Sequence, residues 1–132
     1  MKINTEISVG ELLDKISILK IKSSKIKDEE KLKNINKELQ SLNLIVDQSL
    51  KSYKALGKRS NELMDVNLKL WSIEDDIREK EREKCFDDCF IQLARSVYIT
   101  NDKRFEIKNK INKESGSSFS EEKSYEKYWC PT

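Results

Sequence analysis

Apolar side chains recur at steps of three or four residues along most of this chain, and this spacing constrains its fold more than any other feature. The longest such stripe comprises Leu32, Ile35, Leu39, Leu42, Val46, Leu50, Tyr53 and Leu56. A step of three or four places side chains on one face of an α-helix, whereas a half-buried strand needs a step of two. The chain has only three Gly and one Pro, and 38% of its residues are charged. This balance favours long solvated helices over a sheet with many tight turns, so we predict an all-α protein.

Local signals at the ends of the stripes predict four helices. Ser8 and Glu11 have the spacing of a capping box, which marks a helix start, and Gly57 and Gly116 stand where helices are expected to end. The expected segments are an extended arm over 1–8, helices over 9–27, 29–56, 60–84 and 86–113, and a tail or short helix over 117–132. Because the connections are short, we expect antiparallel neighbours in an up-and-down bundle of four helices that forms a single domain over 1–132.

The charge balance and the hydropathy pattern narrow the class of partner. The chain has 26 basic and 24 acidic residues, so no strong positive field favours nucleic acid as a partner. No apolar run approaches the roughly 18 residues that a membrane-spanning helix needs, and no targeting leader opens the chain. We therefore expect a cytoplasmic protein without membrane association.

Missing histidines restrict the chemistry. Because the chain has no His, a Ser or Cys nucleophile lacks its usual base, and the Glu-x-x-His signature of di-iron bundles is absent. Cys85 and Cys89 stand one helical turn apart, with Cys130 as a third thiol, but without His no familiar zinc set is complete. Glu62 and Asp65 have the ExxD spacing of the Mg²⁺ site in all-α nucleotide pyrophosphohydrolases, but the EExxE element of those enzymes is missing. We therefore predict no metal site and leave the cofactor, Mg²⁺ included, unassigned.

The last predicted helix carries polar residues where its apolar stripe should continue. The stripe that ends at Leu93 and Val97 runs on at the same spacing through Asn101, Arg104 and Lys108. Burying an unpaired charge is strongly unfavourable. These side chains must therefore reach solvent, meet counter-charges or bind an anionic ligand, and the sequence leaves all three interpretations open.

Counting residues from the helix ends brings oppositely charged groups from three helices to similar levels, with a rise of about 1.5 Å per residue. We therefore predict a polar pocket bordered by the first, third and fourth helices, with the arm and the tail closing over its lower end. Its favoured role is to bind a small anionic ligand, and conversion of that ligand, and hence enzymatic activity, stays open. The predicted ligand-binding residues are Glu11, Asp14, Lys15, Glu74, Arg78, Arg95, Asn101, Asp102, Arg104 and Lys108. Among them Arg78, Arg104 and Lys108 would hold the anion.

Two interpretations without a ligand compete with this pocket. Charged pairs at a spacing of four, such as Glu74 with Arg78, commonly decorate solvated helices and stabilise them only slightly. The arm, the long stripe over 32–56 and the aromatic tail would also suit a protein partner or a homodimer, because the first helix is too short to cover that stripe. The alternative function is therefore a helical interaction or dimerisation module.

Four segments of the chain form a recognisable pattern. They are 8–22 (SVGELLDKISILKIK), 70–78 (LWSIEDDIR), 93–112 (LARSVYITNDKRFEIKNKIN) and 121–125 (EEKSY). This pattern resembles a small family of bacterial and viral proteins known only as a domain of unknown function. The resemblance implies a compact helical protein without an established activity, so it assigns no catalytic residue. The matching segments contain all the predicted ligand-binding residues.

Overall fold

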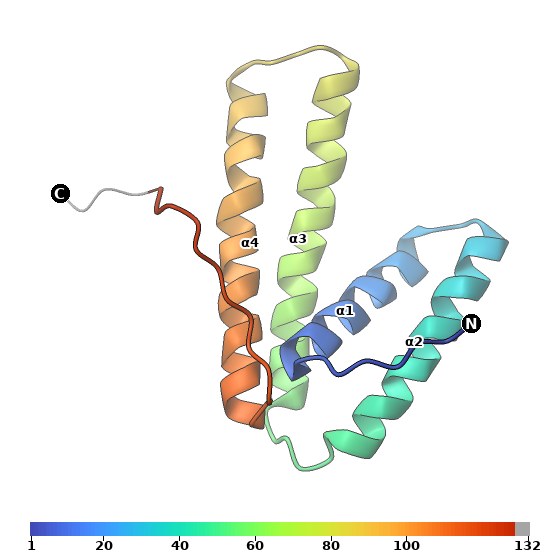
Figure 1. Cartoon of the computed structure of the whole chain (residues 1–132). Coiled ribbons are helices and arrows are strands. Elements are labelled where there is room, and N and C mark those ends of the chain that lie inside the picture. Colours follow the sequence, from blue (N-terminus) through green and yellow to red (C-terminus); the bar gives the residue numbers. More distant parts are fainter. Residues whose placement is uncertain (129–132) are drawn as a thin grey trace.

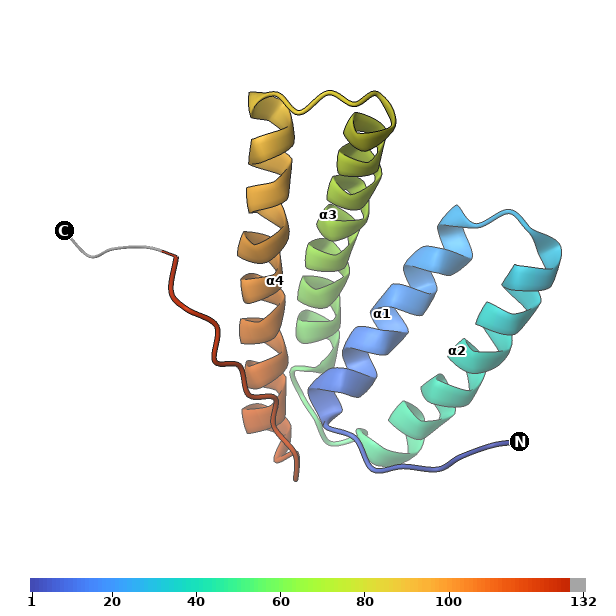
Figure 2. The same cartoon turned by 45° about the horizontal axis from the view of Figure 1, so that its top comes forward.

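Two helical hairpins make up the computed structural model of the chain, which describes residues 1–128. The helices are α1 (Val9–Lys25), α2 (Glu29–Ser49), α3 (Leu56–Arg82) and α4 (Asp88–Ser115). The described residues contain no strand, so the predicted all-α helical bundle is confirmed. The shorter α1–α2 hairpin packs through α1 against the lower half of the α3–α4 hairpin, and the two hairpins cross at an angle (Figures 1 and 2).

Short polar side chains cap three of the helices at their first turn. The Ser8 hydroxyl accepts a hydrogen bond from the Glu11 backbone N–H at 3.1 Å. Asp28 and Asp87 cap α2 and α4 in the same way. These caps satisfy backbone donors that have no partner within the helix. At the other end of α4, Gly116 has a φ of 71°, a left-handed conformation that ends the helix and that other residues rarely adopt.

The connection between α2 and α3 differs from the prediction. Helix α2 ends at Ser49 rather than at residue 56, and α3 begins at Leu56, so that Gly57 lies in the first turn of α3 instead of ending α2. The predicted end of the second helix at residue 56 is wrong because Leu50 and Tyr53 keep a helical spacing although they lie in a turn. Both side chains still pack on the hydrophobic core.

The hydrophobic core lies at the base of the molecule, where α1 meets the α3–α4 hairpin. It consists of Leu13, Leu50, Leu63, Val66 and Ile111, with Val9, Val46, Tyr53, Leu56 and Ile107 packed around it. Helix α2 packs on α1 and has no buried residue within Glu29–Ser49. Its apolar stripe is therefore covered on one side only.

The two ends of the chain do not close over a pocket. Residues 1–7 are exposed and cross in front of α2, whereas residues 117–128 run back along α4 without forming a helix (Figure 1). The prediction that the arm and the tail close over the lower end of the pocket is therefore wrong. Most of the predicted tail is described, but its residues 129–132, which include Cys130, lie outside the described part.

A charged clamp ties the α2–α3 turn to the end of α4. Glu114 Oε1 accepts hydrogen bonds from Tyr53 Oη at 2.7 Å and from Arg59 Nε at 2.9 Å, and its Oε2 accepts one from Arg59 Nη2 at 2.7 Å. The bonds from Arg59 and Tyr53 lower the pKa of Glu114 from 4.5 to about 2. Burial, together with the bond to Glu114, raises the pKa of Tyr53 from 10.0 to about 12. The clamp therefore needs Glu114 in its ionised form.

We expect acidification to weaken this clamp. Because the pKa of Glu114 is lowered in the folded protein, the stability that its charge provides is fully present above about pH 4.5 and is lost as the pH falls towards 2. Glu114→Gln should lower the free energy of unfolding at pH 7 and flatten its fall between those two pH values, as measured by urea denaturation. Glu6→Gln, in the exposed arm, should leave both unchanged. A wild-type pH profile for Glu114→Gln would contradict the clamp.

Candidate functional site

A buried carboxylate joins α1 to α3 and α4. Asp14 is only 1% exposed, and its Oδ1 accepts hydrogen bonds from Arg104 Nε and Asn67 Nδ2, each at 2.9 Å. Its Oδ2 accepts a second bond from Arg104, through Nη2. These bonds to Asp14 raise the pKa of Arg104. The guanidinium that the apolar stripe of α4 presents inward is therefore neutralised by a carboxylate of α1.

Lys108 is buried one turn below and is held by two further carboxylates. Its Nζ lies 2.8 Å from Glu11 Oε2 and 2.7 Å from Glu121 Oε2, and 4.0 Å from Asp14 Oδ2. Burial lowers the pKa of Lys108, but the hydrogen bonds with Glu11 and Glu121 and the charge of Asp14 outweigh it and raise the pKa. Glu11 thus binds Lys108 instead of completing the predicted capping box. The charge of Lys108 is neutralised by carboxylates of the same chain.

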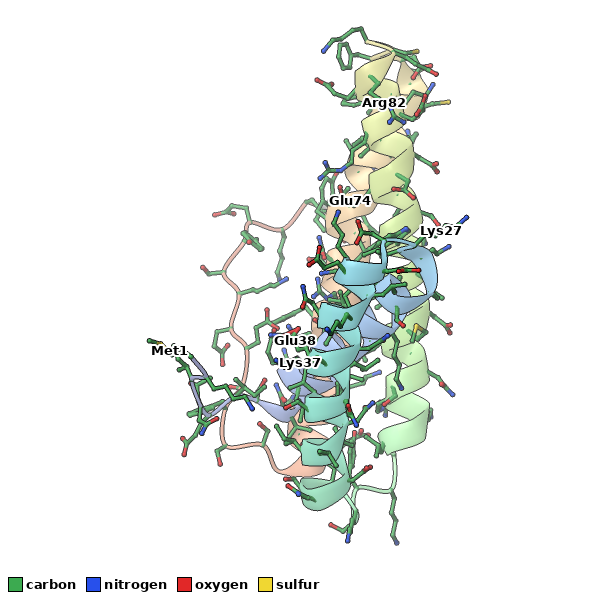
Figure 3. The ribbon with its side chains drawn as sticks, turned by 90° about the vertical axis from the view of Figure 1, so that its right-hand side faces the viewer. Met1, Lys27, Lys37, Glu38, Glu74 and Arg82 are labelled. Atoms are coloured by element: carbon green, nitrogen blue, oxygen red, sulfur yellow. The ribbon has the colours of Figure 1, made fainter. Side chains whose placement is uncertain are left out.

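A cleft of about 420 Å³ opens between α1, α3 and α4, next to the Asp14–Arg104 pair. It is lined by Ile18, Ile21, Asn67, Leu70, Trp71, Glu74, Asp75, Arg78, Asn101 and Arg104. Glu74 and Arg78 form an exposed ion pair at 3.3 Å, and Glu74 lies near the level of the α1–α2 turn that contains Lys27 (Figure 3). Of the predicted residues, the structure therefore brings Glu74, Arg78, Asn101 and Arg104 together at one cleft.

The remaining predicted residues lie elsewhere. The buried Asp14 and Lys108 and the half-exposed Glu11 form an ion cluster beside the cleft rather than part of its lining. Three others face different surroundings. Lys15 points towards α2 and pairs with Glu38 at 3.6 Å, Arg95 is exposed on α4, and Asp102 lines a separate hollow between α4 and the tail, where it binds Tyr128.

Several residues of this region are absent from the predicted site. Trp71 and Asp75 line the cleft, although neither is among the predicted ligand-binding residues. Glu121 lies in the predicted tail or short helix over 117–132, and its side chain reaches back to Lys108. A signal for Glu121 was present, because it begins the EEKSY segment that belongs to the family-like pattern.

The described residues offer no cluster for a metal ion. Within 1–128, no group of three or more His, Cys, Asp or Glu side chains is arranged to hold one. Cys85 and Cys89 are free thiols, the first partly buried and the second exposed. In the same part of the chain, no helix combines the length and the apolar character that crossing a bilayer requires.

Comparison with known proteins places the chain in a family. No curated protein and no solved structure matches it. A family model described as "Family of unknown function (DUF6165)" matches residues 1–131. This match spans nearly the whole chain, and it confirms the resemblance to a family without an assigned activity. The chain therefore belongs to the family of unknown function DUF6165.

Proposed function

We propose that the cleft between α1, α3 and α4 binds a small acid that also carries hydroxyl or amino groups. The observation that supports this proposal most is the convergence of unused hydrogen-bond donors on one hollow. The side chain of Asn101 lines the cleft and makes no hydrogen bond with another described residue. Arg104 uses Nε and Nη2 on Asp14, which leaves Nη1 for a ligand. An amide and a guanidinium on neighbouring turns suit a carboxylate or a phosphate.

The other charged residues of the cleft restrict the chemical class of the ligand further. Arg78 adds a second guanidinium at the outer end, where its partner Glu74 is solvent-exposed. Glu74 and Asp75 also bring two carboxylates to the lining, and ionised carboxylates only accept hydrogen bonds. A ligand with a single anionic group would meet repulsion there. A ligand that also offers hydroxyl or amino hydrogens would bind both kinds of group, with Trp71 covering its apolar face.

Thermal unfolding with a panel of small ligands tests the proposal. The panel would comprise inorganic phosphate, hydroxy acids, amino acids and the corresponding uncharged alcohols. A ligand present at about 100 times its dissociation constant should stabilise the protein by about 2.7 kcal/mol. We expect the hydroxy acids or amino acids to stabilise the protein and the uncharged alcohols to have no effect.

Matched variants locate the binding. Arg78→Gln or Asn101→Ala should weaken binding of a ligand identified in the panel at least about tenfold, which corresponds to about 1.4 kcal/mol. Arg95→Gln removes the same charge from an exposed position outside the cleft and should leave the affinity unchanged. Equal affinities for Arg78→Gln and Arg95→Gln would place the ligand elsewhere and overturn the proposal.

Self-association through α2 is the alternative function. Its apolar stripe is only partly covered by α1, and Leu44 and Ile45 beside it are 55% and 43% exposed. A partly covered apolar stripe on a helix suits packing against a second copy. Three results together would favour this alternative over the cleft. No ligand of the panel would stabilise the protein, and the melting temperature would rise with protein concentration. In Leu44→Glu the melting temperature would no longer depend on protein concentration.

A further inference from the structure

The distal half of the α3–α4 hairpin stands clear of the other two helices. Arg82, near the end of α3, lies well beyond the α1–α2 turn that contains Lys27 (Figure 3). None of the residues 74–99 is buried, whereas Ile73 and Thr100 on either side of this segment are. Two helices alone cannot enclose a core. The distal hairpin therefore leaves its inward-facing apolar groups partly open to solvent.

A groove of about 560 Å³ lies along one face of the distal hairpin. Leu93 and Cys89 of α4 contribute apolar groups, and Asp76, Glu79 and Glu83 of α3 contribute a row of carboxylates. The acidic residues follow one another at steps of three or four, so they share one side of α3. We call this hollow the distal groove. It shares no lining residue with the α1–α3–α4 cleft.

The distal groove has more negative charge than its own cations balance. Lys80 in the groove is paired with Asp87 at 3.1 Å, and Glu79 is paired with Arg82. The side chains of Asp76, Glu83 and Asp88 form no ion pair or hydrogen bond with other residues in the described range 1–128. An apolar floor with uncompensated carboxylates at its edge favours a partner that is apolar in the middle and basic at its sides.

We propose that the distal groove docks an amphipathic helix of another protein, with an apolar stripe flanked by Lys or Arg. The groove follows α3 from Asp76 to Glu83, about 10 Å at 1.5 Å per residue, so about two helical turns would fill it. A second copy seated groove to groove is disfavoured, because each copy would set the same carboxylates against those of its partner. The geometry would instead resemble other cases in which an amphipathic helix lies in an apolar groove.

Binding of synthetic helical peptides tests this inference. The probe is a fluorescently labelled peptide with Leu on one face and Lys on the other, compared by anisotropy with a peptide of the same length that carries Glu in place of Lys. We expect the Leu/Lys peptide to bind and the Leu/Glu peptide not to bind. Asp76→Lys with Glu83→Lys should weaken binding of the Leu/Lys peptide at least about tenfold, since each reversal replaces an attraction with a repulsion.

A control with the same change in net charge separates the groove from general attraction between a basic peptide and an acidic surface. Asp47→Lys with Asp65→Lys reverses two exposed acidic residues outside the distal groove and should leave the affinity nearly unchanged. Equal weakening in the two double variants would overturn the inference. So would equal binding of the two peptides, binding of neither, or dimers of the intact protein that dissociate in Asp76→Lys with Glu83→Lys. Circular dichroism checks that each variant is folded.

Discussion

Asp14→Ala should destabilise the protein by about 3–5 kcal/mol, because removing one partner of a buried ion pair leaves the other charge without compensation. Asp14 is 1% exposed and accepts two bonds from Arg104 and one from Asn67. A loss of this size is a large fraction of the free energy of unfolding of a typical domain, which is about 5–15 kcal/mol. Urea denaturation followed by circular dichroism would measure it.

A surface pair provides the control for Asp14. Glu74→Ala breaks the exposed Glu74–Arg78 pair and should change the free energy of unfolding by no more than about 0.5 kcal/mol. Asp14→Leu combined with Arg104→Met should be less destabilised than Asp14→Leu alone, because the double variant leaves no unpaired buried charge. Similar decreases in the free energy of unfolding for Asp14→Ala and Glu74→Ala would show that the buried ion pair stabilises the protein no more than the exposed one.

Gly10→Ala should destabilise the protein by about 2–3 kcal/mol, although alanine is the better helix former. A Cβ at this position would lie 2.7 Å from the Lys108 carbonyl oxygen and 3.0 Å from Asn112 Oδ1. The first of these atoms belongs to the backbone of α4 and cannot turn aside, so α1 would have to move away. That movement would also stretch the 2.7 Å hydrogen bond from the Gly10 N–H to Asn112 Oδ1.

Gly57 is a matched control, since a Cβ added there would meet no atom within 4 Å. Gly57→Ala, in the first turn of α3, should stabilise the protein by about 0.4–1 kcal/mol through the lower entropy of the unfolded chain. The two glycine substitutions should thus have opposite signs in thermal or urea denaturation. The same sign and size for both would mean that the close approach of α1 to α4 is not limiting.

The helices were predictable where their signals are local. Helix α1 begins at Val9 and α2 at Glu29, as expected, because a cap such as Ser8 binds a backbone N–H only three residues away. The end of α2 was not predictable in this way. Leu50 continues the spacing of the stripe and is buried, and spacing alone does not distinguish a helical residue from a turn residue that packs on the same core.

Spacing placed the basic residues of α4 on the line of its apolar stripe, but it left open whether they reach solvent, meet counter-charges or bind a ligand. Lys108 is buried and Arg104 is partly buried. The carboxylates that pair with them could not be predicted from spacing. Lys15 faces Glu38 of α2 instead of α4, because the α1 surface that carries it is turned towards the other helix of its own hairpin. Glu121 meets Lys108 only because the tail runs back along α4.

The amino-acid sequence alone predicts the helical class and the helix starts that carry a capping residue, because both depend on hydrogen bonds and periodicities within a few neighbouring residues. The packing of the helices determines which carboxylates neutralise Arg104 and Lys108, and which charges border an open cleft. Those outcomes depend on how the two hairpins cross, and contacts between residues far apart in the chain, such as Gly10 against the backbone of Lys108, set that crossing.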